Sequence, residues 1–249
     1  MRSPPRFFAE GRGAVSFTYD DSLDCHPDLV APALEARGFR GTFYTPVTEP
    51  LLRRWDDWAA LAARGHGLGT HTLIHPCRGH PGAEWRVPAR DLRLYDLKRW
   101  EMEVDLANLI LDKLEGRAWR TFGNTCHHNT LGPDGDETLL DDHMRPRFLA
   151  ARGTCRGPGQ TLDPTQLHLG NLGTLAGDNL SPEQWIAAAT LAAERGHWVI
   201  FTFHHVGPVA GRLTIAGDTH NALLNHCLSL ADRLDVAPVR DVVEHLEKG

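Results

Sequence analysis

Segments with strand character and segments with helix character alternate along most of this chain. Residues 14–19 (AVSFTY) are rich in β-formers, and the helical pattern that follows at residues 27–37 ends at Gly38. Near the other end, residues 198–203 (WVIFTF) are apolar throughout, which is typical of a parallel strand buried on both faces. Repeated strand–helix units without a break in composition predict a single α/β domain of the barrel type.

The other predicted elements continue this alternation. Further strands are predicted at residues 41–45, 67–70, 118–123, 147–151 and 235–239. Further helices are predicted at residues 55–64, 91–115, 182–195, 220–233 and 240–247. In a barrel of this type the catalytic residues lie at the carboxyl ends of the strands. Polar residues that directly follow a predicted strand are therefore the candidates for chemistry.

Composition excludes several classes of protein. The chain has 249 residues and a net charge of −6, and it contains no run of Lys or Arg, so nucleic acid is not an expected partner. No stretch approaches the ~18 consecutive apolar residues of a membrane span. Residues 1–13 are interpreted as an N-terminal extension without the apolar core of a signal peptide. The expectation is a cytoplasmic protein, or a secreted one if a leader has been removed.

The cysteines carry little pattern. There are five of them, an odd number, and no two are arranged as C-x-x-C. This pattern predicts neither a disulfide framework nor a zinc site built from thiolates.

Two adjacent carboxylates, Asp20 and Asp21, directly follow the first predicted strand. Aspartate at such a position often caps a helix or forms a turn. The alternative is a division of labour, in which one carboxylate binds a metal ion and its neighbour acts as a general base. The residues by themselves leave both interpretations open.

The histidines offer further candidates. His71 and His75 follow the strand at 67–70, and on a helix their spacing would place both imidazoles on one face, as a divalent metal requires. With 15 histidines in 249 residues, about one such pair is expected by chance, so the position after a strand carries this interpretation. His204 ends the strand at 198–203 and is either a rim residue of the core or a general acid.

Two other features have weaker interpretations. Cys126 stands beside His127 and His128, which would suit a thiol nucleophile, but no third residue that orients the pair is evident. Most of the seven tryptophans are assigned to the core. Trp85, in the loop at residues 76–90, is the best candidate for stacking against a sugar.

Together these segments resemble the polysaccharide deacetylases, carbohydrate esterase family four. Residues 18–22 (TYDDS) are similar to the T-F-D-D-G motif of that family, and residues 71–75 (HTLIH) to its H-[S/T]-x-x-H motif. Residues 201–204 (FTFH) are similar to its last motif, an apolar strand that ends in a histidine. The ordered motifs extend over about residues 14–246.

The resemblance implies a distorted (β/α)7-type barrel and a hydrolase that removes N- or O-linked acetyl groups from a carbohydrate. It implies that Asp21, His71 and His75 bind one divalent metal ion, most often zinc. It further implies that Asp20 is the general base and His204 the general acid. The catalytic domain would then be residues 14–249, with the acetylated carbohydrate as its substrate.

The third motif of the family is altered in this chain. Where the family has R-P-P-Y-G or A-Y-P-C-G, residues 123–127 read GNTCH, without the proline and the final glycine. The resemblance places a backbone N–H of the oxyanion hole near Cys126, and Arg152 is expected to replace the missing arginine by pairing with Asp20. Tyr44 and His127 are further candidates for contact with the substrate.

The altered loop leaves two alternatives for its histidines. Either His127 and His128 face solvent while the Cys126 N–H serves as the oxyanion donor, or a histidine side chain takes over part of that role. Two other functions also stay open. One is hydrolysis of a C–N bond in a ureide or imide ring on the same scaffold, and the other is carbohydrate binding without catalysis. Joint retention of base, metal ligands and acid favours a hydrolase.

Overall fold

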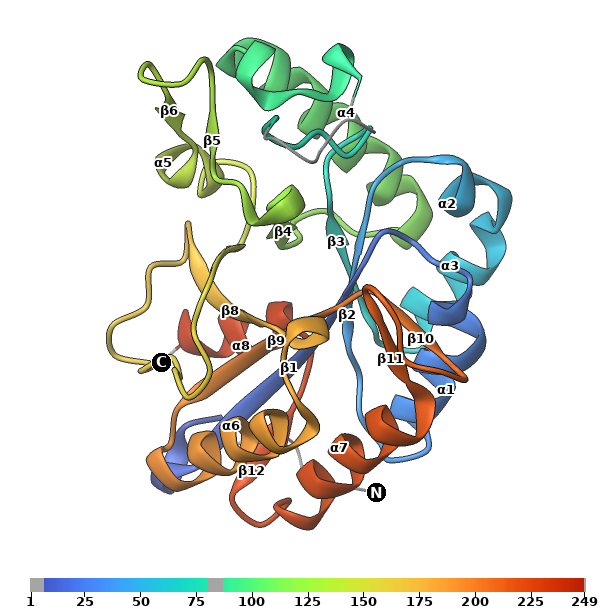
Figure 1. The fold of residues 1–249 in the computed structure, drawn as a ribbon, viewed down its shortest axis with the longest axis vertical. Coiled ribbons are helices and arrows are strands. Elements are labelled where there is room, and N and C mark those ends of the chain that lie inside the picture. Colours follow the sequence, from blue (N-terminus) through green and yellow to red (C-terminus); the bar gives the residue numbers. More distant parts are fainter. Residues whose placement is uncertain (1–6, 80–86, 249) are drawn as a thin grey trace.

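The centre of the molecule is a closed barrel of parallel strands. The computed structural model describes residues 7–79 and 87–248. Within these residues, seven parallel strands follow one another around the barrel, and the last pairs with the first (Figure 1). In barrel order they are β1 (Gly13–Asp20), β2 (Thr42–Thr45), β3 (Gly67–Thr70), β4 (Phe122–Gly123), β7 (Ala151–Cys155), β8 (Leu172–Ala176) and β9 (Trp198–Phe203).

Strand β1 explains why the barrel is distorted. One edge of β1 pairs with β9 over residues 14–19. The other edge pairs first with β12 (Leu234–Val236) and then, from Thr18 onward, with β2. An eighth strand is thus wedged into the amino-terminal half of a seven-stranded barrel. The α/β fold and the (β/α)7-type barrel expected from the sequence are confirmed.

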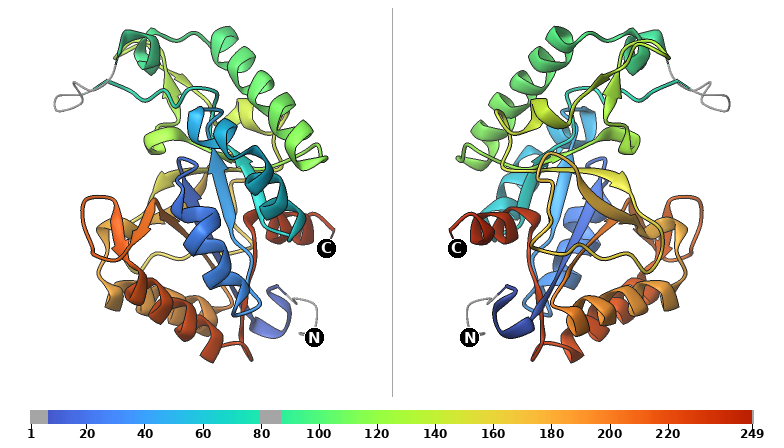
Figure 2. Two further views of the ribbon diagram at one scale, coloured as in Figure 1. Left: turned by 90° about the vertical axis from the view of Figure 1, so that its right-hand side faces the viewer. Right: turned by 90° about the vertical axis from the view of Figure 1, so that its left-hand side faces the viewer.

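Helices surround the barrel on the outside (Figures 1 and 2). Figure 2 shows α6 and α7, in orange and red, side by side beneath the barrel, and α4, in green, at its opposite end. The helices are α1 (Ala31–Glu35), α2 (Glu49–Arg53), α3 (Trp55–Ala63), α4 (Leu97–Glu115), α5 (Asp141–Met144), α6 (Pro182–Arg195), α7 (Gly217–Ser229) and α8 (Val239–Leu246). A π-helical segment, His26–Val30, leads into α1. No helix of the described ranges is both long and apolar enough to cross a membrane.

Two small sheets lie outside the barrel. Strand β5 (Thr130–Leu131) pairs with β6 (Thr138–Leu139) in an antiparallel arrangement. Strand β10 (His205–Gly207) pairs with β11 (Thr214–Ala216) directly after β9. These sheets were not predicted from the sequence, because strands of two or three residues are too short to show a period.

Alternation along β1 separates a packed outer layer from a polar interior. Val15, Phe17 and Tyr19 join the main hydrophobic core together with residues of α1, α6 and α7. The intervening residues Ser16, Thr18 and Asp20 are also buried but make polar contacts across the barrel. Because successive side chains of a strand point to opposite faces, Asp20 lies at the inner, carboxyl-terminal end of this polar row.

Several predicted boundaries were wrong for local reasons. The helix predicted from residue 91 begins at Leu97, because the side chain of Asp96 caps it by accepting a hydrogen bond from the Arg99 N–H at 2.7 Å. The strand predicted at 118–123 is extended only at its end, because Trp119 has a φ of 63°. The strand predicted at 147–151 instead runs over Ala151–Cys155, so Arg152 lies within a strand and not after it.

A buried histidine beside the barrel gives a test by pH. The ring of His66 accepts a hydrogen bond from the Gly41 N–H at 3.0 Å and lies 3.0 Å from Glu35 Oε1. Burial lowers the pKa of His66 to about 4, although Glu35 opposes this shift. An unfolded histidine has a pKa of about 6.5, so below that pH the unfolded chain binds more protons and the native state loses stability.

We expect this residue to contribute a loss of up to about 1.4 kcal/mol per pH unit as the pH falls from about 6.5 towards 4. Urea unfolding of wild type and His66→Gln at several pH values measures it. The free energy of unfolding of the variant should depend less steeply on pH over this window. Equal slopes for the two proteins would contradict the assignment.

Candidate active site

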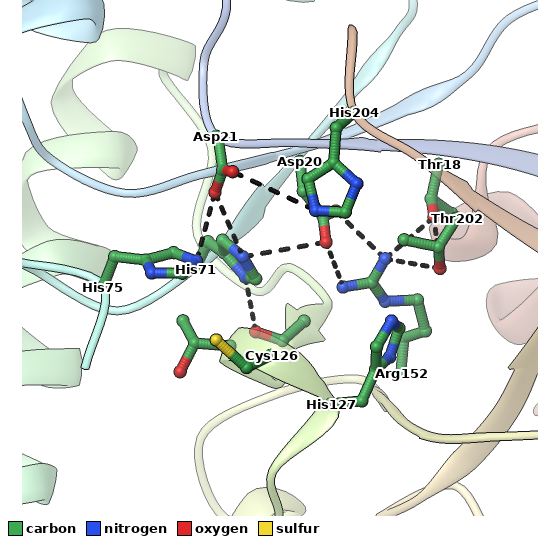
Figure 3. Close-up of polar contacts among 12 residues, drawn as sticks. Thr18, Asp20, Asp21, His71, His75, Cys126, His127, Arg152, Thr202 and His204 are labelled. Atoms are coloured by element: carbon green, nitrogen blue, oxygen red, sulfur yellow. Dashed lines mark hydrogen bonds and ion pairs between the residues drawn. The ribbon is translucent and has the colours of Figure 1, made fainter. Parts of the chain in front are cut away.

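Five polar side chains meet at the carboxyl ends of the barrel strands. Asp20 is the last residue of β1 and Asp21 follows it, while His71 and His204 directly follow β3 and β9. Figure 3 shows these four residues and His75 directed toward one region, with Arg152 on the far side of Asp20. The topology brings them together because parallel strands of a closed barrel all end on the same face.

Asp20 is held in a buried ion pair. Arg152 binds both of its carboxylate oxygens, with Nη1 3.0 Å from Oδ1 and Nη2 2.7 Å from Oδ2. Burial would raise the pKa of Asp20, but the Arg152 guanidinium and His71 hold it below its usual range. Asp20 is therefore an oriented carboxylate at neutral pH.

The rest of the barrel interior fixes Arg152. Its Nη1 also donates to Thr202 Oγ1 at 2.7 Å and to Thr18 Oγ1 at 3.1 Å. Its guanidinium carbon lies 4.6 Å from the centre of the Tyr44 ring. Arg152 pairs with Asp20 as predicted, but it lies within strand β7 and not after a strand.

Asp21, His71 and His75 place three ligand atoms within 4.8 Å of one another. Asp21 Oδ1 is 3.1 Å from His75 Nε2 and 3.7 Å from His71 Nε2. This oxygen is buried and makes no hydrogen bond to a described residue, despite the two nearby ring nitrogens. One carboxylate and two imidazoles that face one another in this way fit a divalent metal ion, and this donor set suits zinc.

His71 is prepared for such a role by its surroundings. Its Nδ1 lies 2.7 Å from the carbonyl oxygen of Gly123 and is the donor in that contact, so Nε2 is the atom that faces the carboxylates. Burial lowers the pKa of His71 to about 4, although Asp20 opposes the shift. The ring is thus neutral at pH 7, as a metal ligand must be.

The two histidines do not share a helical face, so that expectation was wrong. Residues 71–75 form an irregular loop, in which Thr72 and His75 have φ angles of 64° and 57°. The Thr72 hydroxyl accepts a hydrogen bond from the His75 N–H at 3.0 Å and stabilises this path. The loop brings the imidazoles together at a ring separation of 4.9 Å.

His204 forms a pair with a residue that the sequence did not reveal. Its Nδ1 lies 2.6 Å from Asp178 Oδ2, and its Nε2 lies 4.0 Å from Asp21 Oδ2. Burial would lower the pKa of His204, but Asp178, together with Asp20 and Asp21, raises it to about 9. His204 is therefore protonated at neutral pH and can act as an acid. Asp178 follows β8, a strand that was not predicted.

A disulfide joins Cys77 to Cys126, so the prediction from the cysteine pattern was wrong. The two residues are 49 positions apart, but they follow the neighbouring strands β3 and β4. The flanking residues add two hydrogen bonds: the Thr125 hydroxyl donates to the Pro76 carbonyl, and the Arg78 N–H donates to His128 Nδ1 at 3.0 Å. The spacing along the sequence could not indicate this pairing.

The segment around Cys126 has an unusual backbone. Thr125–His127 form a single tight turn in which Cys126 and His127 have φ angles of 51° and 57°. Within the described ranges, no acceptor takes the Cys126 backbone N–H. An oxyanion donor must have its N–H free of other acceptors, so the role expected for Cys126 stays a prediction.

Comparison of the sequence gives limited information. No model of a known protein family matches the chain. A gellan lyase from Bacillus sp. is 33% identical over 67 residues, which is 27% of this chain. The matched segment makes up 3% of that enzyme.

Comparison of the structure is decisive for the fold. A proposed polysaccharide deacetylase from Mycobacterium smegmatis matches with a TM-score of 0.61 at 14% identity, over 100% of this chain and 95% of its own. A peptidoglycan N-acetylglucosamine deacetylase matches with a TM-score of 0.56 at 15% identity, over 94% of this chain and 89% of its own. The chain has the polysaccharide deacetylase fold.

The polysaccharide deacetylase fold also occurs in a protein described as a pseudoenzyme. That protein, from Bacillus anthracis and carbohydrate esterase family four, matches with a TM-score of 0.53 at 12% identity. The match covers 93% of this chain and 66% of the pseudoenzyme. Activity must therefore be argued from the side chains at the barrel end and not from the fold.

On this deacetylase fold, the remaining candidates lie as follows. Tyr44 is fully buried, its hydroxyl donates to Thr121 Oγ1 at 3.2 Å, and its ring faces the Arg152 guanidinium. His127 is partly buried, and its Nδ1 lies 3.1 Å from the Gly153 carbonyl. His128 binds Arg78, so neither histidine of this loop is a free solvent-facing residue. Trp85 lies outside the described residues.

Proposed function

We propose that this chain is a metal-dependent deacetylase that hydrolyses N- or O-acetyl groups of a carbohydrate. The observation that carries the proposal is Asp21 Oδ1, buried without a hydrogen bond beside the Nε2 atoms of His71 and His75. A candidate base, Asp20, and a candidate acid, His204, both adjoin this cluster. Binding alone would require neither of them.

Asp21, His71 and His75 would hold one divalent ion, with zinc favoured by the donor set. When bound, such an ion polarises a carbonyl and lowers the pKa of a neighbouring water. Asp20 would accept the proton of the attacking water, and Arg152, which binds both of its oxygens, would hold the carboxylate in orientation.

His204 completes the proposed reaction as the acid. Asp178 binds Nδ1 and leaves Nε2 directed toward Asp21. The imidazolium can therefore donate a proton to the leaving nitrogen or oxygen of the sugar. The Cys126 N–H would stabilise the negative charge that develops on the acetyl oxygen.

Acetate release tests the proposal directly. The purified chain would be assayed on a panel of N- and O-acetylated sugars and oligosaccharides, with a ureide and an imide ring compound included. Release that stops with a chelator and returns with Zn²⁺ is the expected result. Ring opening without acetate release would assign the C–N hydrolase alternative, and binding without any hydrolysis would assign the non-catalytic one.

The third-motif loop gives a separate prediction. If the Cys126 backbone N–H stabilises the oxyanion, His127→Ala should keep kcat within about tenfold of wild type, because a backbone donor does not depend on that side chain. Steady-state kinetics on the best substrate measure this, with His128→Ala as the matched control. A loss of roughly 10²-fold or more in His127→Ala alone, at unchanged metal content, would assign the oxyanion role to the His127 imidazole.

A further inference from the structure

The Cys77–Cys126 disulfide lies directly behind one of the candidate metal ligands. Cys77 Sγ is 3.8 Å from His75 Nδ1. The other ring nitrogen of His75, Nε2, is the atom that faces Asp21 Oδ1 at 3.1 Å. A single imidazole therefore stands between the carboxylate cluster on one side and two sulfur atoms on the other.

The side chains around the disulfide are of the types that bind metal ions. His75, Cys77 and Cys126 each offer one ligand atom, and these atoms lie within 4.8 Å of one another. While the sulfurs are bonded to each other, they have no thiolate to offer. Thiolates with an imidazole are typical zinc ligands, and three protein ligands leave a fourth position for water.

We propose that reduction of the Cys77–Cys126 disulfide creates a second divalent-cation site, made of His75 Nδ1, Cys77 Sγ and Cys126 Sγ. The ion it takes is a thiolate-binding one, such as Zn²⁺. This site goes beyond the proposed deacetylase function and does not depend on it, because it requires only the three side chains and a free metal ion.

The redox step balances with a dithiol as the reductant. Cys126 is exposed and Cys77 is buried, so the thiolate of the reductant attacks the Cys126 sulfur and the Cys77 sulfur leaves. The second thiol of the reductant then resolves the mixed disulfide. Two electrons and two protons pass to the cysteines, and the reductant becomes a disulfide. Each cysteine releases its proton when it binds the ion, and the His75 ring also releases its N–H proton where both of its nitrogens hold an ion.

The two loops have further contacts that favour a site after reduction. The hydrogen bonds from Thr125 to Pro76 and from Arg78 to His128 do not involve the sulfurs and flank them on both sides. They hold the two cysteines near each other when the covalent bond is gone. The ion would then replace the disulfide as the link between the loops.

Cobalt(II) provides a direct probe, because cobalt bound to thiolate shows a ligand-to-metal charge-transfer absorption that nitrogen and oxygen ligands do not give. The full chain would be reduced with dithiothreitol, freed of it under anaerobic conditions and titrated with Co²⁺. We expect the absorption in reduced wild type and none in oxidised wild type. Its absence from the reduced chain would overturn the proposal.

Matched variants identify the sulfurs involved. Cys126→Ser changes an exposed side chain and should abolish the absorption, whereas Cys155→Ser, which changes an exposed free cysteine, should retain it. Equal absorption in reduced Cys126→Ser and wild type would assign it to other cysteines and overturn the proposal. The comparison of oxidised with reduced wild type needs no substitution, so the test stands even where a variant fails to fold.

Discussion

Asp20→Asn is expected to lower kcat by about 10²–10⁴-fold, the usual contribution of a general base. The amide keeps the shape of the carboxylate but cannot accept the proton of the attacking water. Asp21, His71 and His75 are unchanged, so the metal content should equal that of wild type. Acetate-release kinetics and elemental analysis on the same preparation measure both quantities. A variant with near wild-type kcat would show that another residue is the base.

Asp20→Asn is also expected to lower the stability of the protein. Arg152 is fully buried and loses its countercharge when Asp20 becomes neutral. Removal of one partner of a buried pair typically costs about 3–5 kcal/mol of stability. The rate must therefore be measured well below the melting temperature. The double variant Asp20→Asn/Arg152→Gln, which removes both charges, should recover stability but not activity.

The sequence predicted three of the barrel strands closely. Strands β9 and β3 were predicted with their observed bounds, and β1 to within a residue at each end. For β9 the reason is that a strand buried on both faces leaves a continuous apolar signal. His204 and the two aspartates follow such strands, so their place at the barrel end could be inferred. The candidate catalytic residues at these strand ends could therefore be predicted from the sequence alone.

Other parts of the site left no such signal. Arg152 lies inside β7, and a buried arginine within a strand contradicts the apolar pattern by which strands are recognised. Asp178 follows β8, whose sequence of small and mixed residues did not indicate a strand. Arg152 pairs with Asp20 across the barrel, and Asp178 pairs with His204 at the end of the neighbouring strand β9, so both contacts depend on the strand order of the barrel.

The loops were the least predictable part. Spacing suggested a helix for His71 and His75, but positive φ angles at Thr72 and His75 turn the chain into an irregular path instead. Residues other than glycine rarely adopt positive φ angles, so the identities of Thr72 and His75 do not predict this backbone conformation. The disulfide likewise depends on the adjacency of β3 and β4 and not on sequence distance.

His204→Ala is expected to reduce kcat by about 10²–10⁴-fold. The loss should be greater for N-acetyl than for O-acetyl substrates, because a departing amine needs protonation more than a departing alcohol does. Metal content should stay at the wild-type value, since His204 is outside the ligand set. Equal losses for amide and ester substrates would contradict the role of His204 as the acid for the leaving group.

The pH profile tests how Asp178 tunes this acid. His204 acts in its protonated form, so kcat/KM should fall as the pH rises through its pKa, which the neighbouring carboxylates raise to about 9. Asp178→Asn removes the carboxylate bound to Nδ1, so burial and the loss of charge lower that pKa. The alkaline limb should then move to lower pH by about 1–3 units. The alkaline limb should be absent from the profile of His204→Ala. A limb that stays in place in both variants would show that a group other than His204 sets it.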